Sequence, residues 1–201
     1  MEAPKSFDAV ARAALSKMMQ AVTIDKKKTK ELDAVKAACA ECLNELAPEG
    51  KAAAGGEQEN GAAAETAQKE NGVAGDDASD RRASGIFLPF KLAFDTKNPR
   101  VVEQALEGLH ELIAHGYLKG NCPYPPQPNR KVVDVMVEGV CGCGCINDEQ
   151  VQMHIIRILQ TAVVSEPSHV HGSSLLHSVR TCIIIHLGSS IPANQTAAKA
   201  A

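Results

Sequence analysis

The sequence contains no tryptophan, and aromatic residues make up only 3% of its 201 residues. β-Strands draw heavily on aromatic and β-branched side chains. The hydrophobic share is nevertheless 44%, with alanine contributing much of it. We therefore expect a helical protein with an aliphatic core.

The chain also lacks a strong excess of charge. Its formal net charge is −3 and its pI is near 6.2, whereas nucleic-acid-binding proteins carry a concentrated basic surface. No apolar run approaches the roughly 18–20 residues that span a bilayer, and the first residues do not have a signal-peptide pattern. These features argue against nucleic-acid binding as the main task and against a membrane-spanning segment. They predict a cytoplasmic protein.

Familiar catalytic motifs are missing as well. The sequence has no glycine-rich loop ending in Lys-Ser or Lys-Thr, no Gly-x-Gly-x-x-Gly turn, no Gly-x-Ser-x-Gly elbow and no His-Glu-x-x-His pair. Nucleotide hydrolysis, dinucleotide-dependent redox chemistry and the common hydrolase mechanisms depend on such motifs. The sequence therefore predicts a chain that is not an enzyme and binds no cofactor.

Seven cysteines without a secretion signal are typical of reduced thiols in the cytosol. Cys39 and Cys42 have zinc or redox spacing, and Cys141, Cys143 and Cys145 lie within five residues. Cys39 and Cys42, however, fall on the apolar face of an expected helix, where cysteine is a small hydrophobic residue. The second cluster lacks the two-residue gap of a zinc knuckle. We favour packed or reduced thiols and no metal site.

The composition changes abruptly between residues 47 and 84. This stretch holds one branched aliphatic residue, Val73, among mainly small, polar and acidic residues. It cannot bury enough apolar surface to offset the ordering of its backbone, which costs about 1–2 kcal/mol per residue. We therefore predict a helical hairpin at 1–46, a disordered acidic linker at 47–84 and a helical body at 85–201.

Apolar residues recur at three- and four-residue steps on both sides of the linker. After it, a short helix is expected at 86–94, with Pro89 in the first turn, where a missing N–H costs little. Asn98 followed by Pro99 predicts the start of a longer helix. Four prolines predict a loop at 121–129.

Further helices are expected after residue 130. The one that begins near Ser173 is expected to bury an apolar face made of Leu175, Leu176, Val179, Cys182, Ile183 and Leu187. Broad apolar faces and short loops favour an all-α solenoid of armadillo or HEAT type, with about seven to eight helices, over a closed bundle. The last helix is unfinished at Ala201, so we expect the body to be truncated within a repeat.

Arg81, Arg82, Ala83 and Ser84 form the pattern of a substrate for a basophilic protein kinase. A phosphate on Ser84 would add about −1.5 to −2 charges. Negative charge favours the start of a helix, and the 86–94 helix is expected immediately afterwards. Ser84 is therefore a candidate phosphorylation site.

The body resembles a known family through an ordered set of blocks. These include FLPFKLAF at 87–94 and LIAHGYLKG at 112–120, together with residues 97–102, 137–143, 151–156, 159–163, 179–182 and 194–200. The set resembles the N-terminal regulatory region of the large brefeldin-A-inhibited (BIG-class) Arf guanine-nucleotide exchange factors. The two leading helices match more loosely. In that family, this region is the dimerisation and cyclophilin-binding (DCB) domain.

The resemblance implies an armadillo-like array without the catalytic Sec-seven domain. It also implies homodimerisation, autoregulatory contact with downstream regions of the same exchange factor, and recruitment to trans-Golgi membranes through Arf- or Arl-type small GTPases. Membrane association would then be peripheral. An unrelated armadillo/HEAT protein-binding adaptor is an alternative from another class, and a thiol-based metal or redox protein is a third.

The matching blocks also supply candidate site residues. Four of them are candidates for partner binding, with structural roles as the competing interpretation: Arg100, Tyr117, Lys119 and Arg180. Four others are expected to have structural roles between helices: Pro89, Pro99, Asn194 and Gln195. For Asn194 and Gln195, we expect hydrogen bonds between helices.

Overall fold

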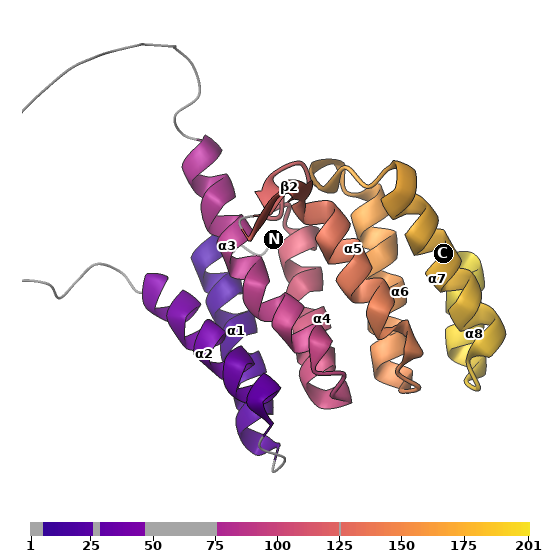
Figure 1. The fold of residues 1–201 in the computed structure, drawn as a ribbon. Coiled ribbons are helices and arrows are strands. Elements are labelled where there is room, and N and C mark those ends of the chain that lie inside the picture. The colour runs from indigo at the N-terminus through magenta and orange to yellow at the C-terminus, as the bar shows by residue number, and fades with distance from the viewer. Residues whose placement is uncertain (1–5, 26–28, 47–75, 125) are drawn as a thin grey trace, which may run out of the picture.

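The computed structural model describes residues 6–25, 29–46, 76–124 and 126–201. Within these residues the chain forms eight α-helices, a two-stranded hairpin and two short 3₁₀ turns (Figure 1). The helices are α1 (Phe7–Ile24), α2 (Lys30–Glu45), α3 (Asp76–Asp95), α4 (Pro99–Ala114), α5 (Val132–Gly142), α6 (Glu149–Val164), α7 (Gly172–Gly188) and α8 (Pro192–Ala200). The predicted all-α class is confirmed.

The helices stack in two layers. One layer contains α1, α4, α6 and α8 in that order, and the other contains α2, α3, α5 and α7. Consecutive helices pair across the layers as α1–α2, α3–α4, α5–α6 and α7–α8. Figure 1 shows these pairs following one another along the molecule. Because each pair packs mainly on its neighbours, the armadillo-like solenoid is confirmed.

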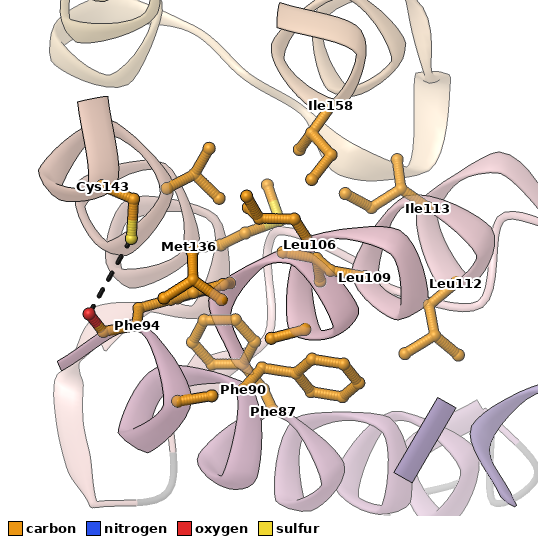
Figure 2. Close-up of a cluster of buried hydrophobic side chains, with 14 of the residues drawn as sticks. Phe87, Phe90, Phe94, Leu106, Leu109, Leu112, Ile113, Met136, Cys143 and Ile158 are labelled. Carbon is orange, nitrogen blue, oxygen red and sulfur yellow. Dashed lines mark hydrogen bonds between the residues drawn. The ribbon is translucent and has the colours of Figure 1, made fainter. Parts of the chain in front are cut away.

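The core is a continuous apolar seam between the two layers. Its centre contains Phe87, Phe90 and Phe94 of α3 against Leu106 and other aliphatic side chains of α4, α5 and α6 (Figure 2). All four of these named residues are at most 1% exposed. The aliphatic core expected from the composition is thus assembled around the few phenylalanines that the chain possesses.

Local signals account well for the ends of α4. The Asn98 side chain accepts a hydrogen bond from the backbone N–H of Arg100, and Pro99 is the exposed first residue of the helix. At the other end, Gly116 has a φ of +70°. The backbone N–H of Gly116 donates to the carbonyl of Ile113, and the backbone N–H of Tyr117 donates to the carbonyl of Leu112. This pair of bonds is a Schellman C-cap.

The structure corrects the expected start of the helix that contains Pro89. Residues 47–75 of the expected linker lie outside the described residues, and 76–84 form the first turns of α3. Pro89 is therefore a buried residue in the helix interior and does not lie in the first turn. The prediction is wrong because Gly85 and Pro89 both resemble boundary signals, whereas the helix continues through them.

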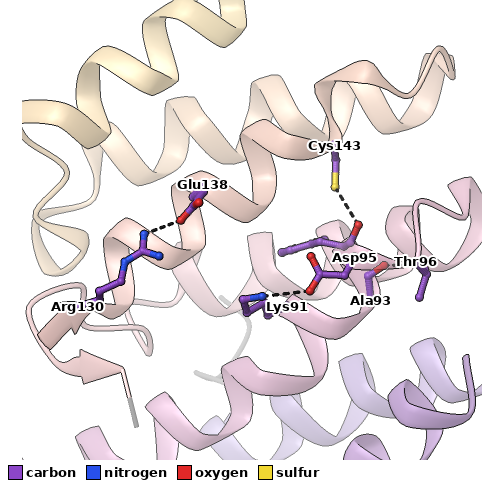
Figure 3. Close-up of polar contacts among 8 residues, drawn as sticks. Lys91, Ala93, Asp95, Thr96, Arg130, Glu138 and Cys143 are labelled. Atoms are coloured by element: carbon purple, nitrogen blue, oxygen red, sulfur yellow. Dashed lines mark hydrogen bonds and ion pairs between the residues drawn. The ribbon is translucent and has the colours of Figure 1, made fainter. Parts of the chain in front are cut away.

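The proline-rich stretch before α5 is also more ordered than predicted. Instead of a plain loop, it contains β1 (Pro123–Tyr124) and β2 (Gln127–Lys131), which pair antiparallel. Tyr124 is buried, and its ring packs edge-on against Phe87 with the ring centroids 6.0 Å apart. Arg130 forms an ion pair with Glu138 of α5 (Figure 3). These contacts at both ends of the hairpin attach it to the helical core.

Candidate protein-binding surface

α7 presents five large apolar side chains to solvent. The exposed fraction is 72% for Leu176, 50% for Val179, 52% for Ile183, 53% for Ile184 and 76% for Leu187. We call these five residues the outer face of α7. The predicted buried face is therefore wrong in orientation: of its members, Cys182 is buried and Leu175 is half-buried, and the other four are exposed.

The buried face of α7 is instead made largely of small polar residues. Ser174, Ser178 and Thr181 are 3–7% exposed, and α7 packs through this face on α5. The Ser174 hydroxyl donates to the carboxylate of Asp134 on α5. Ser178 and Thr181 donate to backbone carbonyls one turn earlier, both at 2.9 Å. Each of the three hydroxyls thus has a hydrogen-bond partner, so this polar face can be buried at little cost. With the polar face packed on α5, the aliphatic face of α7 is left on the outside.

A groove adjoins the outer face between α6, α7 and α8. Its volume is about 430 Å³, and its apolar lining includes Leu159, Val163, Val179, Ile183 and Ala198. Val179 and Ile183 belong to both the groove and the outer face. At the end of α6, Val163 is 44% exposed and extends the apolar surface. An uncovered apolar area of this kind is typical of a site that binds another protein segment.

A buried polar cluster fixes α8 beside this groove. The side chain of Asn194 is fully buried, and its Nδ2 donates to Gln152 Oε1 at 3.1 Å and to the Glu149 carbonyl at 3.2 Å. The Ser189 hydroxyl donates to the same Gln152 oxygen at 2.7 Å. Gln195 donates to the Ser189 carbonyl at 2.7 Å. Asn194 thus links α8 to α6, and Gln195 links α8 to the preceding turn.

Two of the partner-binding candidates, Arg180 and Arg100, lie far apart along the array. Arg180 is exposed on α7, four residues from both Leu176 and Ile184, and this spacing puts it on the same side as the outer face. Arg100 is exposed in the first turn of α4. It borders a depression of about 540 Å³ whose lining includes Asp148. Of these two arginines, only Arg180 lies beside the outer face of α7.

Tyr117 and Lys119 follow the end of α4. The half-buried ring of Tyr117 packs edge-on against Phe7 of α1, with ring centroids 5.5 Å apart. Lys119 is half-buried and borders a depression of about 640 Å³ whose lining also includes Glu166 and His169. The Tyr117 ring has a clear packing role between α1 and α4.

The buried cysteines are poor ligands and poor nucleophiles. Burial raises the pKa of Cys39 to about 12, with the neighbouring Cys42 adding to the effect. Burial, followed by Glu45 and Glu41, raises the pKa of Cys42 to about 11. Cys143 also has a pKa raised to about 11, chiefly by burial, and its thiol donates to the Phe94 carbonyl at 3.8 Å (Figure 2). Protonated thiols of this kind act as small apolar side chains.

The described residues contain neither a cluster of metal-binding side chains nor a membrane-spanning helix. Within 6–25, 29–46, 76–124 and 126–201, no group of three or more His, Cys, Asp or Glu residues is arranged to hold a metal ion. Among the helices in the same ranges, none is both long enough and apolar enough to cross a bilayer.

A two-layer helical solenoid of this kind places the chain in the class of armadillo-type helical arrays. A family model described as the "Mon2/Sec7/BIG1-like, dimerisation and cyclophilin-binding domain" matches residues 9–201. The chain belongs to this DCB-domain family. The resemblance found in the sequence is confirmed, and the family membership replaces the alternative of an unrelated adaptor.

The chain is also similar to much longer proteins that are named as brefeldin A-inhibited guanine nucleotide-exchange proteins. The chain is 46% identical over 120 residues to brefeldin A-inhibited guanine nucleotide-exchange protein 1 of Homo sapiens, covering 59% of this chain and 6% of that protein. It is 36% identical over 115 residues to brefeldin A-inhibited guanine nucleotide-exchange protein 3 of Arabidopsis thaliana, covering 57% and 7%. The matched region is thus a small part of each relative.

Proposed function

We propose that the chain is a non-catalytic regulatory and dimerisation module of a large Arf guanine-nucleotide exchange factor in Golgi vesicle trafficking. The DCB-domain match over residues 9–201 supports this function, as do relatives named as guanine nucleotide-exchange proteins. In this proposal the module associates with itself and contacts downstream regions of the same exchange factor. It acts from the cytoplasm, at the surface of trans-Golgi membranes.

The observation that carries the docking role is the outer face of α7. Repeats of a solenoid bury their apolar faces on neighbouring repeats, yet Leu176 and Leu187 are more than 70% exposed. The relatives are far longer than the matched region, which is 6% of the human protein. We infer that further helices of the exchange factor cover this face and its groove. When the chain is alone, a second copy covers the same surface, and self-association results.

Sedimentation equilibrium over a range of concentrations tests this surface. We expect reversible association of the wild-type chain and a monomer for the Leu176→Asp/Ile183→Asp variant, because charge on the outer face opposes its burial. Leu88→Asp is the matched control, since Leu88 is an apolar residue of α3 that is 36% exposed. The control should associate like the wild type, and circular dichroism should show all three proteins folded. A monomeric wild-type chain at high concentration would overturn the proposal.

The non-catalytic role has a direct test. Arf loaded with a fluorescent GDP analogue and mixed with the chain should lose the nucleotide at its spontaneous rate. The full-length exchange factor is the positive control. Acceleration by the chain alone would show that it carries exchange activity.

Recruitment by a small GTPase is the remaining part of the proposal. Vesicles that display an Arf-like GTPase should bind the chain more strongly when the GTPase holds GTP than when it holds GDP. Arg180→Glu and Arg100→Glu then separate the two exposed candidate positions, because these residues lie on α7 and α4. Equal binding in both nucleotide states would remove recruitment from the proposal.

A further inference from the structure

The exposed prolines of the described chain are of two kinds. Two of them, Pro99 and Pro192, are the first residues of α4 and α8, so the backbone that follows each ring is helical. The other three lie in the hairpin segment before α5, outside any helix: Pro123, Pro126 and Pro128. Proteins that recognise proline bind it in an extended chain. The hairpin is therefore the part of the described chain that offers such a ligand.

Pro128 lies in an irregular part of this hairpin. The strands pair at Tyr124 with Gln127 and at Pro123 with Lys131. Between these two pairs β2 contains three residues, beginning with Pro128, whereas β1 contains none. The extra residues form a β-bulge, where the ladder of hydrogen bonds is interrupted and a sheet can accommodate proline.

The chain on both sides of Pro128 is accessible. Gln127, Pro128 and Asn129 are all exposed, so a partner can reach the ring and the backbone that flanks it. Pro123, by contrast, follows Cys122, whose carbonyl accepts a hydrogen bond from the first N–H of α5 at 2.9 Å. The backbone before Pro123 is thus held by the helix. Of these two prolines, Pro128 has the more accessible surroundings.

Contacts on both sides of the bulge hold it in place. The buried ring of Tyr124 packs on Phe87 of α3, with the ring centroids 6.0 Å apart. At the other side, Arg130 forms an ion pair with Glu138 of α5 (Figure 3). Because its flanks are fixed, the bulge loses less conformational entropy on binding than a free chain end would lose. The proline is presented in a nearly pre-organised form.

The family description that matches residues 9–201 names cyclophilin binding, and cyclophilins are prolyl isomerases, enzymes that act on the bond before proline. We propose that Gln127, Pro128 and Asn129 form the binding site for a prolyl isomerase of the cyclophilin class, whose active site receives the Pro128 ring. The bulge supplies the apolar ring and the exposed backbone on either side of it. This inference rests on the family membership and not on the function proposed for the outer face of α7.

Isothermal titration of the 201-residue chain with purified cyclophilin A tests the site. We expect binding to the wild type and an affinity lower by more than about tenfold for Pro128→Ala, because a methyl group buries less apolar surface than the proline ring. Pro192→Ala is the matched control, since Pro192 is an exposed proline of α8, and it should bind like the wild type. Circular dichroism should show all three proteins folded.

Cyclosporin A provides a test that needs no variant. This inhibitor occupies the active site of cyclophilin A, so it should prevent binding to the wild-type chain. Absence of binding to the wild type would overturn the proposal. Binding that is unchanged by Pro128→Ala or by cyclosporin A would overturn it as well, because the isomerase would then contact another part of the chain.

Amide NMR signals locate the contact on the chain. With cyclophilin A present, the signals of Gln127 and Asn129 should shift, and those in the first turns of α4 and α8 should keep their positions. Shifts confined to α4 or α8 would overturn the site at Pro128. Sedimentation equilibrium separates this site from the proposed self-association, since Pro128→Ala should associate like the wild type. A chain that binds cyclophilin A through Pro128 but stays monomeric would support this site and overturn only the self-association.

Discussion

The Ser174 hydroxyl donates a hydrogen bond to the carboxylate of Asp134, and this bond joins α7 to α5 across the end of the array. Asp134 is half-buried and Ser174 is 5% exposed. A buried hydroxyl without a hydrogen-bond partner costs free energy. The bond to Asp134 therefore favours the orientation of α7 that buries Ser174 and leaves the outer face of α7 exposed.

Ser174→Ala should destabilise the chain. The half-buried carboxylate of Asp134 loses a donor, so we expect the free energy of unfolding to fall by about 1–3 kcal/mol. Urea denaturation measures the change. Ser173→Ala is the matched control because Ser173 is exposed, and it should stay within about 0.5 kcal/mol of the wild type. Equal losses in the two variants would show that the bond to Asp134 contributes nothing.

Gly108 allows α4 to approach α1. A Cβ on Gly108 would lie 2.6 Å from the Cβ of Ala14 and 3.2 Å from the ring of Phe90. Gly108→Ala gains helix propensity worth about 1 kcal/mol, but the contact with Ala14 forces two buried helices apart. We expect a net loss of about 1–3 kcal/mol from overpacking, measured as a lower urea midpoint.

Two further variants separate the steric effect from helix propensity. Gly142→Ala is the control, because its Cβ would meet only the Lys97 amine, at an ordinary 3.5 Å. It should leave stability unchanged or raise it slightly. Ala14→Gly combined with Gly108→Ala should recover part of the loss, since the new methyl group fills the space of the old one. If the double variant only adds the two single losses, the close contact is not the cause.

The sequence predicts most of the helices because their signals are local. Ser6 and Asn98 cap α1 and α4, and their apolar stripes match the buried residues. The same local reasoning fails for α7, because one side of this helix carries large apolar residues and the other carries small polar residues, both at helical spacing. Which side is buried depends on Asp134, a residue forty positions earlier. Pro89 is misplaced for a similar reason, since its ring is accommodated by tertiary packing that local propensity does not describe.

The exposed surface on α7 is therefore less predictable than the fold that supports it. The sequence indicates Arg180 as a candidate, but it predicts that most of the exposed apolar residues around Arg180 are buried. The signal that could have indicated the surface is the Ser174, Ser178 and Thr181 stripe, whose small side chains suit close helix packing. Hydrophobicity alone predicts that Leu176 and Ile183 are buried in preference to this polar stripe.

Cysteine labelling should follow burial. Cys145 is exposed, whereas Cys39 and Cys143 are fully buried with pKa values raised to about 12 and about 11. At mildly alkaline pH the folded chain should therefore incorporate iodoacetamide at Cys145 well before Cys39 or Cys143, because the thiolate is the reactive form. Peptide mapping reads the order, and labelling in denaturant should remove the difference. Early modification of Cys143 in the folded chain would contradict its buried position.

Acid should weaken the array through His154 of α6. Burial lowers the pKa of this histidine, with Glu103 and Glu107 acting in the opposite direction and Arg157 and His110 reinforcing the shift. The unfolded state then binds a proton that the folded state does not, so the contribution of His154 to stability is full above its ordinary pKa of 6.5 and declines as the pH falls below it. His154→Gln should make the urea midpoint less sensitive to a change from about pH 7.5 to about pH 5.5. A variant that loses as much stability on acidification as the wild type would show that this imidazole is protonated equally in both states.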